Sequence, residues 1–318
     1  MTTPPSEISV TLPFGQALSR VKAVLFQPFD LAKWFLIGFC AWLAYLGESG
    51  SGGSFNSGTW REHSGQNLRL ELEHARDYVM NNIGWIAPLA IALFLVTLTL
   101  GLVILWISSR GKFMFLHCVA LNRAEVSLPW QSFAREANSL FLFRVAVAFL
   151  GMLVVLPSVV ALVWTVLKMI LADSANAVGI LVALALVLLL MLLGLIYWVI
   201  KRLMNDFVVP IQFLRRSRCL AAWSELRRLL PGNLSNFILY VLFRIVIGLG
   251  TGMLVLAVIL VTCCIAGCLF AIPYLGTVFL LPILVFERSY SICYFAQLGP
   301  DYNVFAAPVP PTLDQPSV

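Results

Sequence analysis

The sequence predicts an all-α membrane protein with six transmembrane helices, arranged as three hairpins with cytoplasmic interfacial helices. The chain is 60% hydrophobic and only 11% charged, whereas soluble domains carry about 25% charged residues. Residues 236–286 contain a single Asp, Glu, Lys or Arg, which is Arg244. A bilayer core of about 30 Å needs about 20 apolar residues for each helical crossing. This stretch is therefore long enough to cross the membrane twice.

Apolar runs alternate with polar connections along the whole chain. An amphipathic segment at residues 14–26 is too short and too charged to span, so we expect it to lie in the interface. Pro28 should end this helix, and Asp30 should cap the next one. The six spans are expected at residues 31–46, 83–107, 140–171, 178–200, 236–261 and 265–286.

The connections differ in character. Residues 47–58 are rich in Gly and Ser and predict a flexible loop, and residues 66–80 carry a helical stripe of apolar side chains. Residues 112–121 are apolar but short, which predicts a second interfacial segment with His117 solvated or at the interface. The Pro-rich residues 301–318 predict a disordered tail, which leaves residues 1–300 as a single integral membrane domain.

A short motif recurs one hundred residues apart. Residues 142–145 read LFRV and residues 242–245 read LFRI, and the apolar runs that follow are also similar. We interpret this as a triplicated hairpin. The alternative is a chance similarity between two helices that are both rich in Leu and Val. Parallel repeats occur in transporters, but any hairpin can duplicate, so the repeat alone does not indicate transport. The repeat units would be residues 11–107, 108–200 and 201–287.

The distribution of Lys and Arg predicts the orientation. Basic residues concentrate in the N-terminal segment and in the connections at residues 108–144 and 201–235, whereas acidic residues outnumber them in the loop after the first span. Cytoplasmic loops carry the excess of Lys and Arg in membrane proteins. We therefore expect the basic side, with both termini, to be cytoplasmic.

Two arginines at matching repeat positions, Arg144 and Arg244, enter apolar runs from the basic side. One interpretation is that both side chains extend to lipid phosphates at the membrane surface. The other is an internal cationic pair that binds an anionic headgroup or substrate. Asp30 and Asp206 are possible partners of these arginines, and such pairing would make a purely structural network.

A basic cluster lies at residues 215–228, where Leu side chains and Trp223 accompany the arginines. This composition predicts a helix that lies on anionic lipid. The cluster would either anchor the topology or bind lipid specifically. Its arginines, the remaining candidates for lipid or anion contact, are Arg215, Arg216, Arg218, Arg227 and Arg228.

No motif of catalysis accompanies these residues. The chain has no HExxH, GxSxG or Walker A sequence and no Cys/His spacing of the zinc type. We therefore expect no catalytic residues, no metal and no cofactor. The net charge of the chain is +6. The basic residues lie beside the predicted spans, and no nucleic-acid-binding motif accompanies them. The expected partners are therefore membrane lipids with anionic headgroups rather than nucleic acid.

Three segments carry a resemblance to known families. The stretches PFDLAKWFLIGF at residues 28–39, SRGKFMFL at residues 109–116 and DFVVPI at residues 206–211 resemble poorly characterised bacterial six-span membrane families of unknown function. Those families are related to the membrane domain attached to some glycerophosphodiester phosphodiesterases. The resemblance implies a protein of the bacterial cytoplasmic membrane. It implies no activity and assigns no functional residue.

These observations favour a non-enzymatic membrane protein that acts in envelope or lipid homeostasis through contact with anionic lipid. The alternative is a small-molecule or lipid transporter of the permease kind. The interiors of the third to sixth spans contain no Asp or Glu, which weakens the case for an ion-coupled carrier. A membrane enzyme is a third class, and the absence of paired acid and base residues counts against it.

Overall fold

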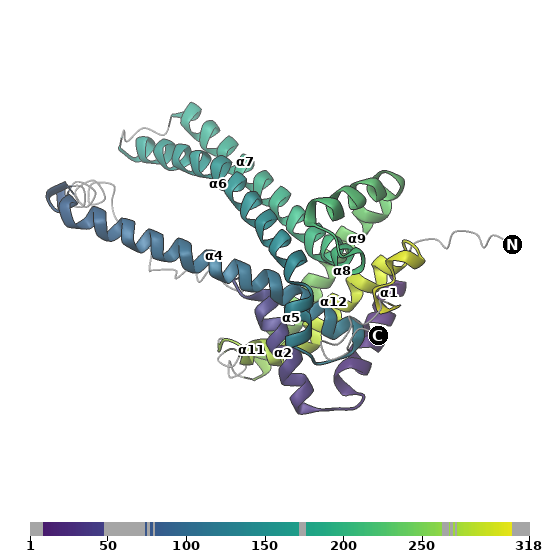
Figure 1. The fold of residues 1–318 in the computed structure, drawn as a ribbon. Coiled ribbons are helices and arrows are strands. Elements are labelled where there is room, and N and C mark those ends of the chain that lie inside the picture. The colour runs from purple at the N-terminus through teal and green to yellow at the C-terminus, as the bar shows by residue number, and fades with distance from the viewer. Residues whose placement is uncertain are drawn as a thin grey trace. The chain divides into compact units, whose positions relative to one another are not determined.

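The computed structural model of the chain describes residues 9–47, 74, 77–78, 80–171, 176–262, 267, 270 and 272–306. Every regular element in these residues is helical (Figure 1). The chain divides into two compact units. The first comprises Met1–Leu46, Leu105–Phe143 and Arg202–Val318, and the second comprises Gly47–Ile104 and Arg144–Lys201.

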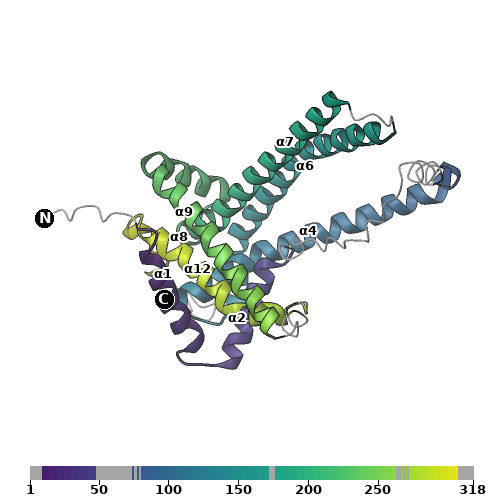
Figure 2. The same cartoon turned by 180° about the vertical axis from the view of Figure 1, so that it is seen from behind.

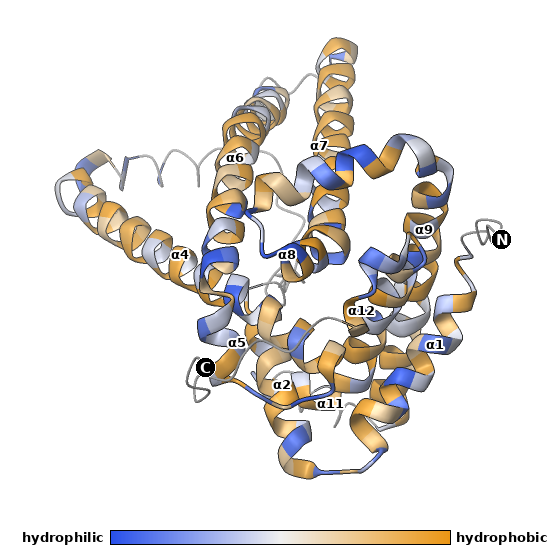
Figure 3. Ribbon diagram, turned by 45° about the vertical axis from the view of Figure 1, so that its right-hand side comes forward, coloured by the Kyte–Doolittle hydropathy of each residue, from blue (hydrophilic) through white to orange (hydrophobic). Residues whose placement is uncertain are grey.

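Within the described part of the chain, four helical segments are long and apolar enough to cross a membrane. They are built from α4 (Ile83–Leu121), α6 (Ala134–Leu171), α7 (Ala177–Leu203) and α9 (Cys219–Val261). The segment that begins with α7 continues through a π-helical turn, Met204–Val208, and α8 (Val209–Arg215). Hydrophobic residues cover most of the length of α4, α6 and α7 (Figure 3). Four apolar helices of this length indicate a membrane protein.

The first and the sixth predicted spans are not single long helices in the structure. The first predicted span is the short apolar helix α2 (Leu31–Tyr45), and the described part of the sixth is divided between α11 (Leu275–Phe279) and α12 (Leu281–Ala296). Residues 263–266, 268–269 and 271 of that region lie outside the described residues. Six crossings and the triplication of a hairpin therefore remain predictions.

Helix α9 joins two segments that the sequence analysis separated. The basic residues 219–230 form its first part, and the predicted fifth span forms its second part. The backbone of Asn233, at φ −137° and ψ 23°, departs from helical geometry directly after Pro231. Proline lacks an N–H and clashes with the preceding turn, so the helical path is kinked here and α9 consists of two helical parts.

Residues 112–121 are not the interfacial segment that the sequence predicted. They form the C-terminal end of α4, and Phe113 to Ala120 are buried in the core of the first unit. The prediction for His117 is wrong for the same reason, because its side chain is fully buried. Hydropathy alone does not separate an apolar segment that faces lipid from one that faces protein.

The first unit is held together by short helices around a buried aromatic core. Helix α1 (Leu12–Val21) packs along α12, and α2 packs against α11 and α12 (Figures 1 and 2). Asp30 caps α2 as predicted, since its carboxylate accepts a 2.9 Å hydrogen bond from the N–H of Ala32. The largest fully buried rings belong to Tyr240, Tyr290, Tyr294, Phe113, Phe115, Phe133, Phe207 and Phe295.

The contact between α2 and α4 depends on a glycine. A Cβ atom at Gly111 would lie 2.5 Å from the backbone nitrogen of Ala44. Next to this contact, the hydroxyl of Ser108 donates a 2.9 Å hydrogen bond to the carbonyl of Ala44. Glycine therefore lets the two backbones approach closely, as small residues do in membrane helix pairs.

The described part of the second unit consists of helices. It contains α4 as far as Ile104, α6 from Arg144 and α7 as far as Lys201. A Cβ atom at Gly179 would lie 3.1 Å from the sulfur of Met169, so the adjoining ends of α6 and α7 are in close contact. The predicted loop at residues 47–58 and most of the helical stripe at residues 66–80 lie outside the described residues.

Beyond α12 the chain stays structured for a further short stretch. Two 3-10 turns, Pro300–Tyr302 and Val304–Ala306, return to the first unit, and Val304 is fully buried. Residues 307–318 of the predicted tail lie outside the described residues. The ordered core thus includes the first residues of the Pro-rich segment.

Candidate functional site

A group of charged side chains is buried inside the first unit. It is assembled by the end of α7, the π-helical turn, the second part of α9 and α12, which bring Arg202, Asp206, Arg244 and Glu287 together. We call these four residues with Arg288 and Tyr240 the ion cluster. Arg244 is 3% exposed and Asp206 is 4% exposed. Charged groups removed from water to this degree require partners.

Asp206 is the best-satisfied member of the ion cluster. Its Oδ2 atom accepts a 2.9 Å hydrogen bond from the hydroxyl of Tyr240. The same oxygen lies 3.4 Å from Nε of Arg202 and 3.8 Å from Nε of Arg244. Tyr240 and Arg244 are four residues apart on α9 and so share one helix face. The π-helical turn that carries Asp206 is a feature often found at functional sites.

Glu287 supplies the second carboxylate. Its Oε2 atom accepts a 2.9 Å hydrogen bond from Nη2 of Arg244 and lies 3.9 Å from Nη2 of Arg202. Both arginines therefore bridge both carboxylates, which gives two balanced pairs of opposite charge. Arg202 and Glu287 keep part of their surface open, with side chains 24% and 19% exposed.

Arg288 adds a third guanidinium, and its surroundings differ from those of the other two. It is 8% exposed, and its Nη1 donates a 2.6 Å hydrogen bond to the backbone carbonyl of Asn205. The side chain of Asn205 accepts a hydrogen bond from Lys112. Among the described residues, no carboxylate forms an ion pair with Arg288, and its Nε and Nη2 have no hydrogen-bond acceptor. Burial lowers the pKa of Arg288, because the protein interior disfavours the charged form.

Arg144 and Arg244, which occupy matching positions in the predicted repeat, belong to different units. Arg244 lies in the first unit and pairs with Asp206, the arrangement that would make a structural network. Arg144 is half-buried and lies in the second unit. Asp30 is exposed and caps α2.

The basic cluster at residues 215–228 separates into two groups. Nε of Arg215 lies 3.4 Å from Oε1 of Glu225. Cζ of Arg216 lies 3.8 Å from the ring centre of Phe133, and its Nη1 donates a hydrogen bond to the carbonyl of Ser132. Partial desolvation lowers the pKa of Arg216, and the charge of Glu136 opposes this shift. These two side chains are therefore engaged within the protein.

The second group consists of Arg218, Arg227 and Arg228. All three are exposed, and none forms an ion pair with a described residue. Arg227 and Arg228 lie on the first part of α9, whose opposite side is buried through Cys219, Ala222 and Leu226. We call the three exposed arginines the basic face. Arg218 is the N-cap residue of α9, and Arg227 and Arg228 lie on its first part, which the core holds in place.

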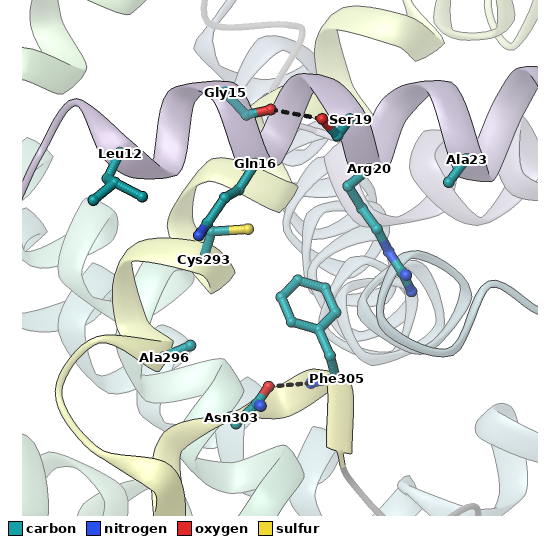
Figure 4. Close-up of a pocket in the computed structure, with 10 residues that line it drawn as sticks. All are labelled: Leu12, Gly15, Gln16, Ser19, Arg20, Ala23, Cys293, Ala296, Asn303 and Phe305. Atoms are coloured by element: carbon teal, nitrogen blue, oxygen red, sulfur yellow. Dashed lines mark hydrogen bonds between the residues drawn. The ribbon is translucent and has the colours of Figure 1, made fainter.

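A surface pocket of about 830 Å³ lies between α1, α12 and the last 3-10 turns of the first unit (Figure 4). Arg20 reaches over it towards Phe305, with its Cζ 4.9 Å from the ring centre. Its Nη2 also donates to the carbonyls of Ala120, at 2.6 Å, and Val119, at 3.1 Å, so it caps the C-terminus of α4. Burial lowers the pKa of Arg20. The other lining residues are Leu12, Gly15, Gln16, Ser19, Ala23, Cys293, Ala296 and Asn303.

An apolar groove of about 350 Å³ also lies in the first unit, between α1, α9 and α12. Ile247 lines it one turn beyond Arg244 on α9, and Phe286 lines it directly before Glu287 on α12. The remaining lining residues are Phe14, Leu18, Val21, Gly250, Thr251, Leu254, Pro282 and Ile283.

Most of the ion cluster could not be recognised from the sequence. The sequence pattern indicated Arg244 and Asp206, but not Arg202, Tyr240, Glu287 or Arg288. Two local signals were available: Arg202 and Asp206 are four residues apart, and so are Tyr240 and Arg244. Pairs at this spacing share a helix face, although nothing local shows that the two faces meet.

Comparisons with known proteins add a family and no activity. The model of a family described as a family of unknown function (DUF7544) matches residues 10–305. No curated protein and no solved structure matches the chain. The family description makes no connection to glycerophosphodiester phosphodiesterases, so that relation remains a prediction.

Proposed function

Since the chain belongs to the family of unknown function DUF7544, for which no activity is given, we propose from the geometry that it is a non-enzymatic membrane protein that contacts anionic lipid. The basic face on α9 would make this contact. The protein would act in envelope or lipid homeostasis in the bacterial cytoplasmic membrane, with the basic face and both termini in the cytoplasm.

The observation that carries the proposal is that three exposed arginines lie beside apolar helices without an ion-pair partner among the described residues. Arg218, Arg227 and Arg228 are exposed and form no ion pair with any described residue. Each basic residue near an anionic membrane surface contributes about 1 kcal/mol of attraction. The apolar side of the same helix is fixed in the core through Ala222 and Leu226. The arginines are therefore held on a defined surface rather than on a mobile segment.

A lipid-selectivity measurement tests this proposal. The full chain would be reconstituted into bilayers of phosphatidylcholine with increasing phosphatidylglycerol, and spin-labelled lipids of both classes would report their association with the protein. The wild-type protein should prefer the anionic lipid. The triple variant R218Q/R227Q/R228Q should lose most of this preference, because three attractive charges of about 1 kcal/mol each are removed.

A matched variant controls for net charge. Lys22, Arg123 and Arg135 are also exposed in the first unit, and K22Q/R123Q/R135Q removes the same number of positive charges elsewhere. This control should keep most of the preference for anionic lipid. Equal association of both lipids with the wild-type protein, or equal losses in the two triple variants, would contradict the proposed role of the basic face.

A transporter is the second candidate, and the ion cluster is the observation that favours it. Ionisable residues buried among membrane helices often mark the path of a substrate or ion, and Asp206 and Glu287 supply two carboxylates there. Saturable uptake of a solute by proteoliposomes, abolished in the variant D206N, would place transport ahead of lipid contact.

A further inference from the structure

We propose that the ion cluster is a binding site for one oxyanion, a phosphate group, which the free edge of Arg288 holds with help from Arg244. The proposal is independent of the basic face, because none of its residues belongs to that surface. It uses only residues of the first unit.

The ion cluster carries a net positive charge. Arg202, Arg244 and Arg288 carry three positive charges, and Asp206 and Glu287 carry two negative charges, which leaves one positive charge in excess. Arginine does not lose its proton in proteins. An uncompensated charge removed from water is costly. A bound anion of one or two negative charges would remove this excess.

The arginines of the ion cluster have unused hydrogen-bond donors. Arg288 uses only Nη1, for the carbonyl of Asn205. Its Nε and Nη2 are buried without an acceptor among the described residues, and so is Nη1 of Arg244. Buried donors of this kind are rare in proteins, and each one calls for a partner.

The two free donors of Arg288 have a defined geometry. Nε and Nη2 form one edge of the guanidinium plane, and two parallel N–H groups point from this edge. This fork matches two oxygens of a carboxylate or a phosphate. A water molecule would accept one of these N–H groups but would leave the charge in place. The geometry therefore favours an oxyanion over water.

Two sources can deliver a phosphate group to this site. One is free inorganic phosphate, and the other is the headgroup of a phospholipid. The apolar groove follows the same two helices, α9 and α12, as the arginines Arg244 and Arg288. A groove in this place would suit an acyl chain, so both sources enter the test.

The first arm of the test uses thermal unfolding of the purified, delipidated full chain in neutral detergent. Inorganic phosphate, compared with chloride at equal ionic strength, should raise the melting temperature of the wild-type protein by about 2–5 °C at saturation, as binding to the folded state does. The second arm uses native mass spectrometry after incubation with phosphatidic acid or phosphatidylglycerol, which would show retained phospholipid if the source is a lipid.

Variants of Arg288 make the result specific. R288M removes the unpaired charge, so it should melt at the same temperature as the wild-type protein or higher in the absence of phosphate, and it should not respond to phosphate or retain phospholipid. R288K keeps the charge and loses the fork, so it should need about tenfold more ligand. The exposed Arg135 supplies the control R135M, which should behave as the wild-type protein.

The outcomes decide the proposal in every case. A response of the wild-type protein to phosphate or phospholipid that R288M loses and that R288K shows only with more ligand supports the site and identifies its source. No response to either probe, or an equal response in R288K and wild type, overturns the site. The triple variant of the basic face, R218Q/R227Q/R228Q, should keep the response, so a failure of the lipid-contact proposal would be distinguishable from a failure of this one.

Discussion

The guanidinium of Arg244 donates a 2.9 Å hydrogen bond to the carboxylate of Glu287 and so ties α9 to α12 inside the first unit. The two residues are 43 positions apart in the chain. Nη2 of Arg202 lies 3.9 Å from the same carboxylate, and its Nε lies 3.4 Å from the carboxylate of Asp206. A helix that is apolar enough to cross a membrane therefore carries a polar contact to a neighbouring helix of the first unit.

Breaking the contact between Arg244 and Glu287 should destabilise the protein strongly. R244M leaves the buried carboxylate of Asp206 and the half-buried one of Glu287 with Arg202 as their remaining ion-pair partner, so we expect a loss of about 3–5 kcal/mol in the free energy of unfolding. The double variant R244M/E287L removes both charges and should lose less than the sum of the two single variants. Chemical unfolding in detergent micelles, followed by circular dichroism, measures these values.

R135M is the control for this cycle, because Arg135 is exposed. It should change the free energy of unfolding by less than about 0.5 kcal/mol. Strict additivity of R244M and E287L would show that the two side chains do not interact in the folded protein.

The hydroxyl of Tyr240 should contribute through Asp206 alone. Y240F keeps the ring but removes the donor that lies 2.9 Å from the buried carboxylate. The expected cost is about 1–3 kcal/mol, because a buried acceptor loses its partner. Y197F provides the comparison, since Tyr197 is 50% exposed. The two variants should melt at clearly different temperatures, and equal melting temperatures would speak against the buried bond.

Gly111 should not tolerate a side chain. An added methyl group would meet the backbone of α2 at 2.5 Å, so G111A should lower the free energy of unfolding by about 1–3 kcal/mol as the helices separate. Gly101 lies on the same helix and has nothing within 4 Å of the added atom. G101A should therefore stabilise the helix by about 0.5–1 kcal/mol. Changes of the same sign in both variants would refute the close contact of α2 and α4.

Cys293 should react slowly with alkylating reagents in the folded protein. Burial raises the pKa of its thiol to about 11, so the thiolate is scarce at pH 8. The alkylation rate, measured by mass spectrometry of the peptide that contains Cys293, should rise with pH up to about 11 and should be much faster in denaturant.

The same shift in the pKa of Cys293 fixes the sign of a stability effect. The unfolded thiol loses its proton above pH 8.5, whereas the folded thiol keeps it until about pH 11. The folded state then binds more protons, so stability falls as the pH rises through this window. C293A should show a smaller fall than the wild-type protein. An equal fall in C293A and the wild-type protein would contradict the burial of the thiol.

Local features were predictable from the sequence, and tertiary pairings were not. The cap by Asp30 and the helix in residues 14–26 follow from residue types within one turn of each other. The kink near Pro231 is not predictable from the sequence alone, because a proline either ends or bends a helix and only packing decides which. The burial of residues 112–121 was missed because hydropathy is the same for a lipid-facing and a core-facing segment.

The ion cluster shows the same limit at the level of the site. Arg244 was found because it interrupts an apolar run, whereas Glu287 and Arg288 follow a predicted span directly and look like ordinary flanking charges. Only the fold shows that α12 turns these side chains inwards. The basic face was found from charge alone, yet the engagement of Arg216 with Phe133 required the folded structure.

The contact of the basic face with anionic lipid is tested most directly by cross-linking in native membranes. A photoreactive amino acid in place of Leu220, which is 71% exposed on the first part of α9, would capture whatever lies against this surface. The account predicts cross-links to anionic phospholipid that decrease in the R218Q/R227Q/R228Q background. Cross-links only to zwitterionic lipid, only to protein, or unchanged by the triple substitution would contradict it.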